Sequence, residues 1–160
     1  MITDKKISKS NTEFIPLPSD MYQVQIVDVV EKEGIKYAST EKVMQFMFRC
    51  EVVEGEQKAR LLFFFTSESW FDGGKSSKPS KLYNLIKTIY SYYKKNVDVS
   101  TIEEITDAEI NGLVGTQLRV TVEATDAGKN KVTGFLPIKK EVKYEVKNES
   151  VSVDPDLPFP

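Results

Sequence analysis

The 160-residue sequence contains no histidine and a single cysteine, Cys50. Histidine is the commonest metal ligand and the commonest general acid or base, and an intramolecular disulfide needs two cysteines. These absences argue against a zinc centre, a Cys–His nucleophile pair and a disulfide framework. Cys50 falls in the alternating pattern of a predicted strand, which is typical of a small buried side chain. We therefore expect no metal site, no cofactor and no enzymatic activity.

Long apolar runs are also missing. No stretch approaches the roughly 20 consecutive apolar residues that are needed to span a bilayer, and residues 1–12 lack the apolar segment of a signal peptide. The composition, 40% hydrophobic and 29% charged, is that of an ordinary soluble protein. The expectation is one domain with short tails, located in the cytoplasm and without membrane contact.

A positive net charge is the third feature that the sequence lacks. The 22 basic and 24 acidic residues give a net charge of −2, but the two signs are unevenly distributed. Residues 55–95 carry a net charge of +5 and are rich in aromatic side chains, whereas residues 148–160 contain three acidic residues and no basic one. A basic, aromatic middle indicates a surface for nucleic acid, and the acidic end would be its counterpart.

Five stretches have patterns that predict β-strands: in four of them apolar residues alternate with polar ones, and the third contains an apolar run. They are residues 21–30, 43–53, 58–66, 115–125 and 131–138, with a possible extension of the fifth strand through 139–147. An apolar stripe predicts a helix over residues 81–95, capped by Ser80, and residues 106–109 fit a capping box for a short second helix. This order predicts an all-β fold with a helical insert: a five-stranded OB-fold barrel with the helix between strands 3 and 4. A plain β-sandwich or an SH3-like barrel is the alternative.

The chain divides into three predicted parts. Residues 1–13 form a flexible arm, residues 14–147 form the OB-fold domain, and residues 148–160 form a disordered acidic tail. Prolines in the last seven residues resist both helix and sheet, so the tail can present its side chains to a partner with a basic rim. The candidate partner-docking residues are Asp154, Asp156, Leu157 and Phe159. A tail that only improves solubility is the alternative.

An OB barrel binds ligands through its second and third strands and through the loops that join strand 1 to 2 and strand 4 to 5. A single strand of nucleic acid requires cations for its phosphates and flat apolar side chains on which bases stack. The candidate nucleic-acid-binding residues on this basis are Lys36, Tyr37, Arg49, Arg60, Phe63, Phe65, Trp70, Lys75, Lys78, Lys129 and Lys131.

Several of these residues have a structural alternative. Both faces of the third strand are apolar, so Phe63 and Phe65 could belong to the core instead of Leu62 and Phe64. The two arginines could be ordinary solvated strand residues. Trp70 lies beside glycines and lysines, which favours a mobile clamp for a bound strand. The alternative is a lid on the end of the barrel.

Short motifs occur along most of the chain, at Leu17–Ile26, Met44–Arg49, Lys58–Phe63, Ser80–Leu82, Leu113–Val120 and Phe135–Pro137. Together they resemble the phage-encoded family of OB-fold single-stranded DNA-binding proteins over about residues 14–140. The sequence departs from this family before the first strand, where Ser19 and Asp20 stand in place of the usual glycine.

The resemblance implies sequence-tolerant binding of single-stranded DNA in replication or recombination, without catalysis, in the cytoplasm of a bacterial host. The tail is similar to the acidic tip that bacterial single-strand binders offer to replication and repair proteins, except that Pro160 follows the usually terminal phenylalanine. An RNA-binding protein, and a protein-interaction or phage structural module on the same scaffold, are the alternatives. Edge-strand pairing between subunits would give a homodimer.

Overall fold

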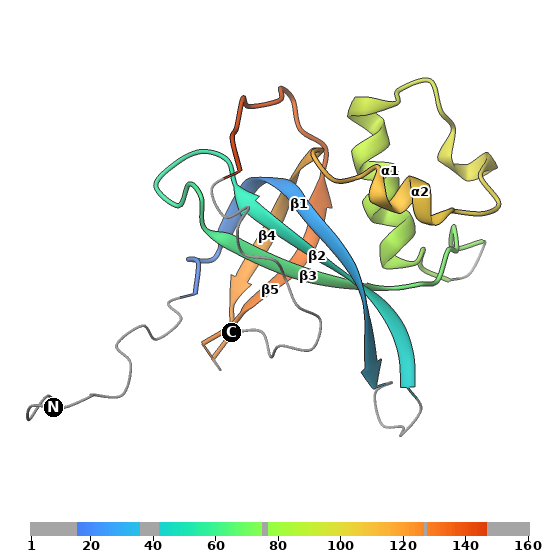
Figure 1. Cartoon of the computed structure of the whole chain (residues 1–160), viewed down its shortest axis with the longest axis horizontal. Helices are drawn as coiled ribbons and strands as arrows, with labels where there is room; N and C mark the ends of the chain where they lie inside the picture. The colour runs from blue at the N-terminus through green and yellow to red at the C-terminus, as the bar shows by residue number, and fades with distance from the viewer. Residues whose placement is uncertain (1–15, 36–41, 75–76, 127, 147–160) are drawn as a thin grey trace, which may run out of the picture.

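The computed structural model describes residues 16–35, 42–74, 77–126 and 128–146. Within these residues the chain forms five antiparallel strands, with helices inserted between the third and the fourth (Figure 1). The elements in chain order are β1 (Asp20–Ile35), β2 (Lys42–Val52), β3 (Leu61–Ser67), α1 (Lys81–Tyr93), the 3-10 turn η1 (Val99–Thr101), α2 (Asp107–Asn111), β4 (Gln117–Ala124) and β5 (Asn130–Leu136). Neither helix of this described part is long and apolar enough to cross a membrane.

The strands form one curled sheet in the order β3-β2-β1-β4-β5. β1 is shared between two neighbours, because Asp20–Gln25 pair with β4 while most of its length pairs with β2. A register shift between Ile26 and Asp28 bends the strand at this crossover. The edge strands β3 and β5 approach through side chains, with the ring centroids of Phe64 and Phe135 5.1 Å apart. The result is a half-barrel with an OB-like topology, which confirms the predicted fold class.

The inner face of the half-barrel holds the core. Alternate residues of β2, including Phe48 and Cys50, are fully buried there together with Leu62 and Phe64 of β3. The rings of Phe48 and Phe64 stack with their centroids 5.0 Å apart. Burial raises the pKa of the Cys50 thiol, so this side chain is an uncharged part of the core, as the sequence predicts.

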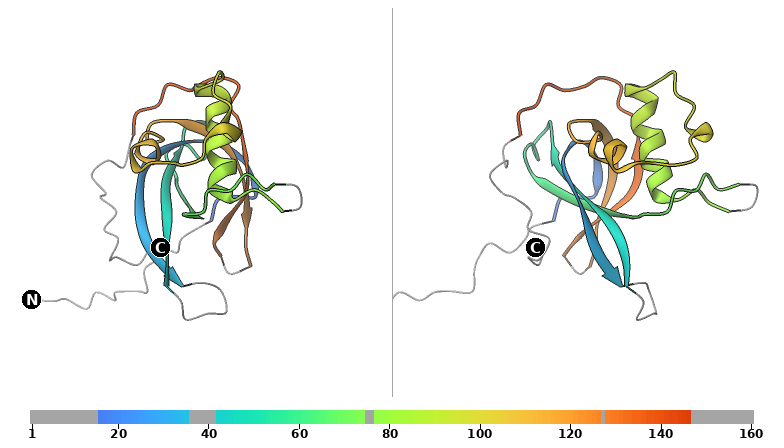
Figure 2. Two further views of the ribbon diagram at one scale, coloured as in Figure 1. Left: turned by 90° about the vertical axis from the view of Figure 1, so that its right-hand side faces the viewer. Right: turned by 45° about the vertical axis from the view of Figure 1, so that its right-hand side comes forward.

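The amphipathic helix α1 lies against the side of the half-barrel where β3 and β5 come together (Figure 2). Its apolar stripe, including Leu85, Ile86 and Ile89, is buried in the core. Ser80 caps the helix as predicted, with its Oγ accepting a hydrogen bond from the Tyr83 amide. Thr106 likewise caps α2, where its Oγ1 accepts from the Glu109 amide.

Several strand boundaries differ from the prediction, most clearly at β1 and β3. β3 begins at Leu61 instead of Lys58, because the preceding residues form a turn in which Gly55 and Ala59 have positive φ. β1 is longer than its apolar pattern indicates, because it continues to Ile35, and together with β2 it projects from the barrel as a two-stranded ribbon (Figures 1 and 2). Backbone pairing continues along this ribbon beyond the core, where side chains no longer alternate in polarity.

Candidate nucleic-acid interface

The two faces of β3 have different roles. Leu62 and Phe64 point into the core, whereas Phe63 is half-buried and Phe65 is 38% exposed on the opposite side. Phe63 pairs with Arg49 of β2, and Phe65 pairs with Met47. These four residues, Met47, Arg49, Phe63 and Phe65, are called the β2–β3 outer face below. The structure thus places the two candidate stacking phenylalanines outside the core.

Arg49 is less accessible than the sequence indicates. Its side chain is only 4% exposed, and Met47 beside it is 1% exposed. Arg49 lies between two cross-strand neighbours, Asp28 on β1 and Phe63 on β3. The sequence predicts Arg49 either as a contact for nucleic acid or as a solvated strand residue, and both require an accessible side chain. The structure corrects this prediction. Because β2 is an interior strand, its outward side chains have a neighbouring strand on both sides.

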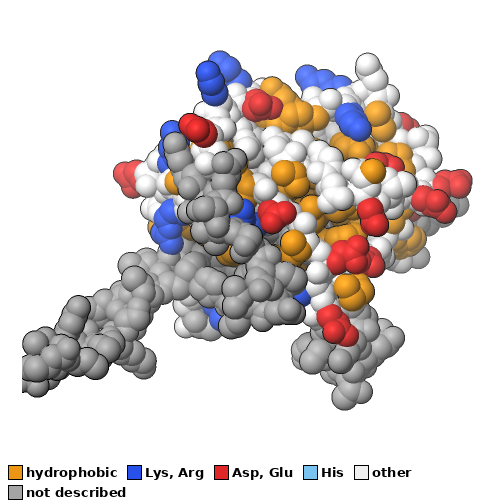
Figure 3. Space-filling model, in the orientation of Figure 1, with side chains coloured by type: hydrophobic (Ala, Val, Ile, Leu, Met, Phe, Trp, Pro, Cys, Tyr) orange, Lys and Arg blue, Asp and Glu red, His pale blue; other side chains and the backbone are white. Residues whose placement is uncertain are grey.

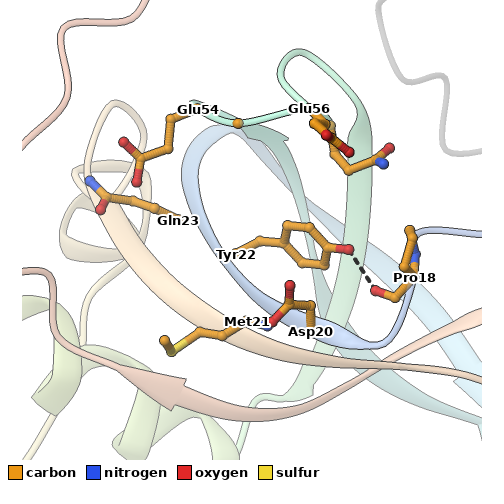
Figure 4. Close-up of a pocket in the computed structure, with 9 residues that line it drawn as sticks. Pro18, Asp20, Met21, Tyr22, Gln23, Glu54 and Glu56 are labelled. Carbon is orange, nitrogen blue, oxygen red and sulfur yellow. Dashed lines mark hydrogen bonds between the residues drawn. The ribbon is translucent and has the colours of Figure 1, made fainter.

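Arg60 lies at the turn before β3, where its Nη1 donates to Gln57 Oε1 at 3.0 Å. It adjoins a pocket of about 650 Å³ whose walls carry the carboxylates Asp20, Glu54 and Glu56, hereafter the acidic pocket (Figure 4). The phenol of Tyr22 lies among these groups and donates to the Pro18 carbonyl at 2.6 Å. Burial raises the pKa of Tyr22, the charge of Asp20 raises it further, and Arg60 opposes both effects. Three carboxylates make this pocket unfavourable for phosphates.

Trp70 is anchored at the end of the barrel. Its Nε1 donates to the Ile102 carbonyl at 2.8 Å, and its ring lies 5.0 Å from that of Tyr83. The half-buried indole packs against the core, which fits the lid interpretation better than the freely moving clamp. Lys78 is exposed farther along the same loop.

The other candidate residues fall into two groups. Lys129 and Lys131 are exposed at the turn between β4 and β5 and on β5 itself. Lys36, Tyr37 and Lys75, together with the docking candidates Asp154, Asp156, Leu157 and Phe159, lie outside the described residues. The structure therefore brings together Phe63, Phe65 and the buried Arg49 on one face of the sheet. It separates Arg60 and Trp70 from that face by placing them at the turn and at the barrel end.

Residues 137–146, called the covering segment below, form a feature that sequence reasoning missed. The predicted extension of the fifth strand through residues 139–147 is absent from the described residues 139–146, because β5 ends at Leu136 and the covering segment makes no strand pairing within the described chain. Instead it leaves β5 and arches across the end of the sheet towards the end of β2 (Figure 1). Tyr144 donates a hydrogen bond to the fully buried carboxylate of Glu51 there.

Gln117 is the main anchor of the covering segment. It is 1% exposed at the start of β4. Its Nε2 donates to the Val142 carbonyl at 2.6 Å, and its Oε1 accepts from the Val142 amide at 2.9 Å. The same side chain also bonds with Gln23 and Gln25 of β1. Glutamines that alternate with apolar residues normally predict a solvated face, so no pattern in the sequence indicated this hydrogen-bond network.

Two tyrosines of α1 hold the covering segment at Glu141, next to Val142. Tyr93 donates from its hydroxyl to Glu141 Oε2 at 2.6 Å and accepts from the Gln117 amide at 3.0 Å. Tyr92 accepts from the Glu141 amide at 3.3 Å. Burial and the hydrogen bond to Glu141 raise the pKa of Tyr93, so its hydroxyl stays protonated and able to donate. The C-terminal end of α1 is thereby coupled to the sheet.

One part of the described surface is densely acidic. Acidic side chains gather over α2 and the β1–β2 ribbon (Figure 3), where Glu31, Glu68 and Asp107 are close enough to interact. Burial raises the pKa of Glu68, and the charges of Glu31 and Asp107 raise it further. An anionic strand is repelled from this region and from the acidic pocket, so its path is restricted to the remaining surface.

The fold and these surfaces define an OB-like half-barrel with an aromatic outer face and separate acidic and basic regions. Neither models of known protein families nor the curated proteins give a match to this chain. A function for this chain is therefore inferred from the geometry of the described residues.

Proposed function

We propose that this protein binds single-stranded DNA without sequence preference and without catalysis, in DNA replication or recombination. The observation that carries the proposal is the placement of Phe63 and Phe65 on the outer face of an OB-like barrel, with Arg49 on the neighbouring strand. Residues two apart on a strand are separated by about 7 Å, and such a pair of rings can each stack on one unpaired base.

Two further features support the proposal. Lys78, Lys129 and Lys131 are exposed on loops or on an edge strand, where they can neutralise phosphates. The motifs that resemble the phage-encoded single-strand binders fall on the elements that build this barrel, from Leu17 to Pro137. A role in a bacterial cytoplasm follows from the same resemblance.

The test is fluorescence anisotropy with a labelled oligothymidylate, a duplex of the same length and an oligouridylate. Tighter binding of the oligothymidylate than of the duplex at the same salt concentration is expected, because only unpaired bases can stack on the outer face. Preference for oligouridylate would point to RNA instead.

A protein-interaction module is the second candidate, and one observation favours it. Arg49 and Glu51 are buried, and the covering segment already occupies part of the outer surface at the end of β2. Absence of binding to any of the three nucleic acids at low salt would support this candidate and reject the first.

Removal of the acidic tail is expected to change DNA affinity. Tyr144, close to the end of the described residues, bonds to Glu51 of β2, two residues from Arg49 of the β2–β3 outer face. Residues 148–160 carry three negative charges that compete with phosphates for nearby cations. Deleting residues 148–160 should tighten oligothymidylate binding at low salt, and the difference should shrink as salt rises. Unchanged affinity at low salt would contradict competition and leave only the docking role, which a pull-down from host extract can test.

A further inference from the structure

Two acid-free segments of the chain meet on one side of the molecule. Residues 77–97 contain five lysines and residues 128–140 contain four, and neither segment contains an Asp or Glu. The first segment includes α1 and the second includes β5, and the two elements are in contact. A chain with a net charge of −2 therefore concentrates nine positive charges on one helix, one edge strand and their flanks.

A groove of about 500 Å³ lies where these segments face each other, hereafter the α1–β5 groove. One wall comes from the start of α1 and the other from β5, and no acidic residue of the described chain lines it. The lining residues with polar side chains are Lys81, Asn84, Thr88, Lys131 and Thr133, and Phe135 adds an aromatic ring. The acidic pocket has the opposite charge, because its lining residues include three carboxylates and no cation.

The two lysines of the groove are close enough to repel each other. Burial lowers the pKa of Lys81, and the charge of Lys131 lowers it further. The Lys81 ammonium lies 6.0 Å from the ring centroids of both Phe64 and Phe135, a distance at the limit of a favourable cation–π contact. The two like charges of Lys81 and Lys131 repel each other, and an anion placed between them would relieve the repulsion.

We propose that the α1–β5 groove binds phosphates of the single-stranded nucleic acid, with Lys81 and Lys131 as a pair of cations on either side of the backbone. This inference rests on the proposed function and extends the contact surface beyond the β2–β3 outer face. Asn84, Thr88 and Thr133 supply hydrogen-bond donors for phosphate oxygens. Lys78 and Lys129 precede the two walls in sequence and are exposed, so they continue the positive surface at the edges of the groove.

The experiment compares two double variants by the salt dependence of oligothymidylate binding. K81Q/K131Q removes both cations of the groove. The control K87Q/K95Q removes two lysines of the same acid-free segment that line a different surface, beside Asp98. Each lost phosphate contact reduces the slope of log affinity against log salt by roughly 0.7 for single strands. K81Q/K131Q should therefore have a slope shallower by about 1.4 and bind more weakly at low salt, while the control keeps a slope closer to that of the wild type.

The outcomes separate the two proposals. A wild-type protein that binds oligothymidylate, together with a K81Q/K131Q variant of unchanged slope, would overturn the groove while leaving the proposed function in place. A wild type that does not bind would overturn both. Equal losses in the two double variants would also reject the groove, because they would show a general effect of charge. Urea denaturation of each variant establishes that the fold is retained, and titration of oligothymidylate followed by NMR should shift the side-chain amide of Asn84 and the amides of Thr133 and Gly134.

Discussion

Replacing Phe65 with alanine is expected to weaken oligothymidylate binding by roughly 5- to 150-fold, because one base–aromatic stack contributes about 1–3 kcal/mol. Phe65 is 38% exposed on β3 and lies outside the core. Its truncation should therefore leave the free energy of unfolding nearly unchanged, so that the loss of affinity reports a lost contact. Anisotropy titrations of both proteins at one salt concentration measure the effect.

Met21 provides the matched control for this substitution. It is an exposed large apolar residue, but it lines the acidic pocket, where phosphates are repelled. M21A should bind oligothymidylate like the wild type. If F65A also binds like the wild type, the outer face of β3 is not the stacking surface, and the assignment of Phe63 and Phe65 fails.

Replacing Gln117 with alanine is expected to release the covering segment. The substitution removes both hydrogen bonds to Val142 and leaves half-buried amide groups of Gln23 and Gln25 without this partner. A hydrogen bond contributes about 0.5–1.5 kcal/mol net, and the loss of several should lower the free energy of unfolding by roughly 1–3 kcal/mol. Trypsin should also cleave faster at Lys139, Lys140 and Lys143, because these sites lie in the segment that Gln117 anchors.

Gln57 serves as the control, since it is a half-buried glutamine in the turn before β3, bonded to Arg60. Q57A should change the free energy of unfolding by less than about 0.5 kcal/mol, as exposed or partly exposed sites usually do, and should leave cleavage at the three lysines unchanged. If trypsin cleaves the covering segment of Q117A no faster than that of the wild type, other contacts hold the segment, and the role assigned to Gln117 is wrong.

The strand order and the position of the helix were predictable because local patterns determine them. Alternation marks the strands, and Ser80 and Thr106 mark the helix starts. The choice between the two faces of β3 was not predictable, because both are apolar. It is decided by α1 and β5, whose side chains cover Leu62 and Phe64 but not Phe65.

Features that depend on contacts between residues distant in sequence were also not predictable, because local patterns do not contain them. Val142 and Tyr144 alternate as in a strand, yet their segment is held by Gln117 and Glu51. Glu51 and Arg49 are charged residues that alternate with apolar ones, which is typical of a solvated strand face, yet both are buried in the folded chain. The α1–β5 groove likewise joins two basic segments that 30 residues separate, so neither segment alone indicates a site.

The salt dependence of oligothymidylate affinity tests the central claim most directly. If the protein binds single strands by phosphate neutralisation and base stacking, log affinity should fall linearly with log salt, by roughly 0.7 per phosphate contact. A duplex of equal length should bind more weakly throughout. Absence of binding at low salt, or equal affinity for the duplex, would contradict the proposal that this OB-like half-barrel is a single-stranded DNA-binding protein.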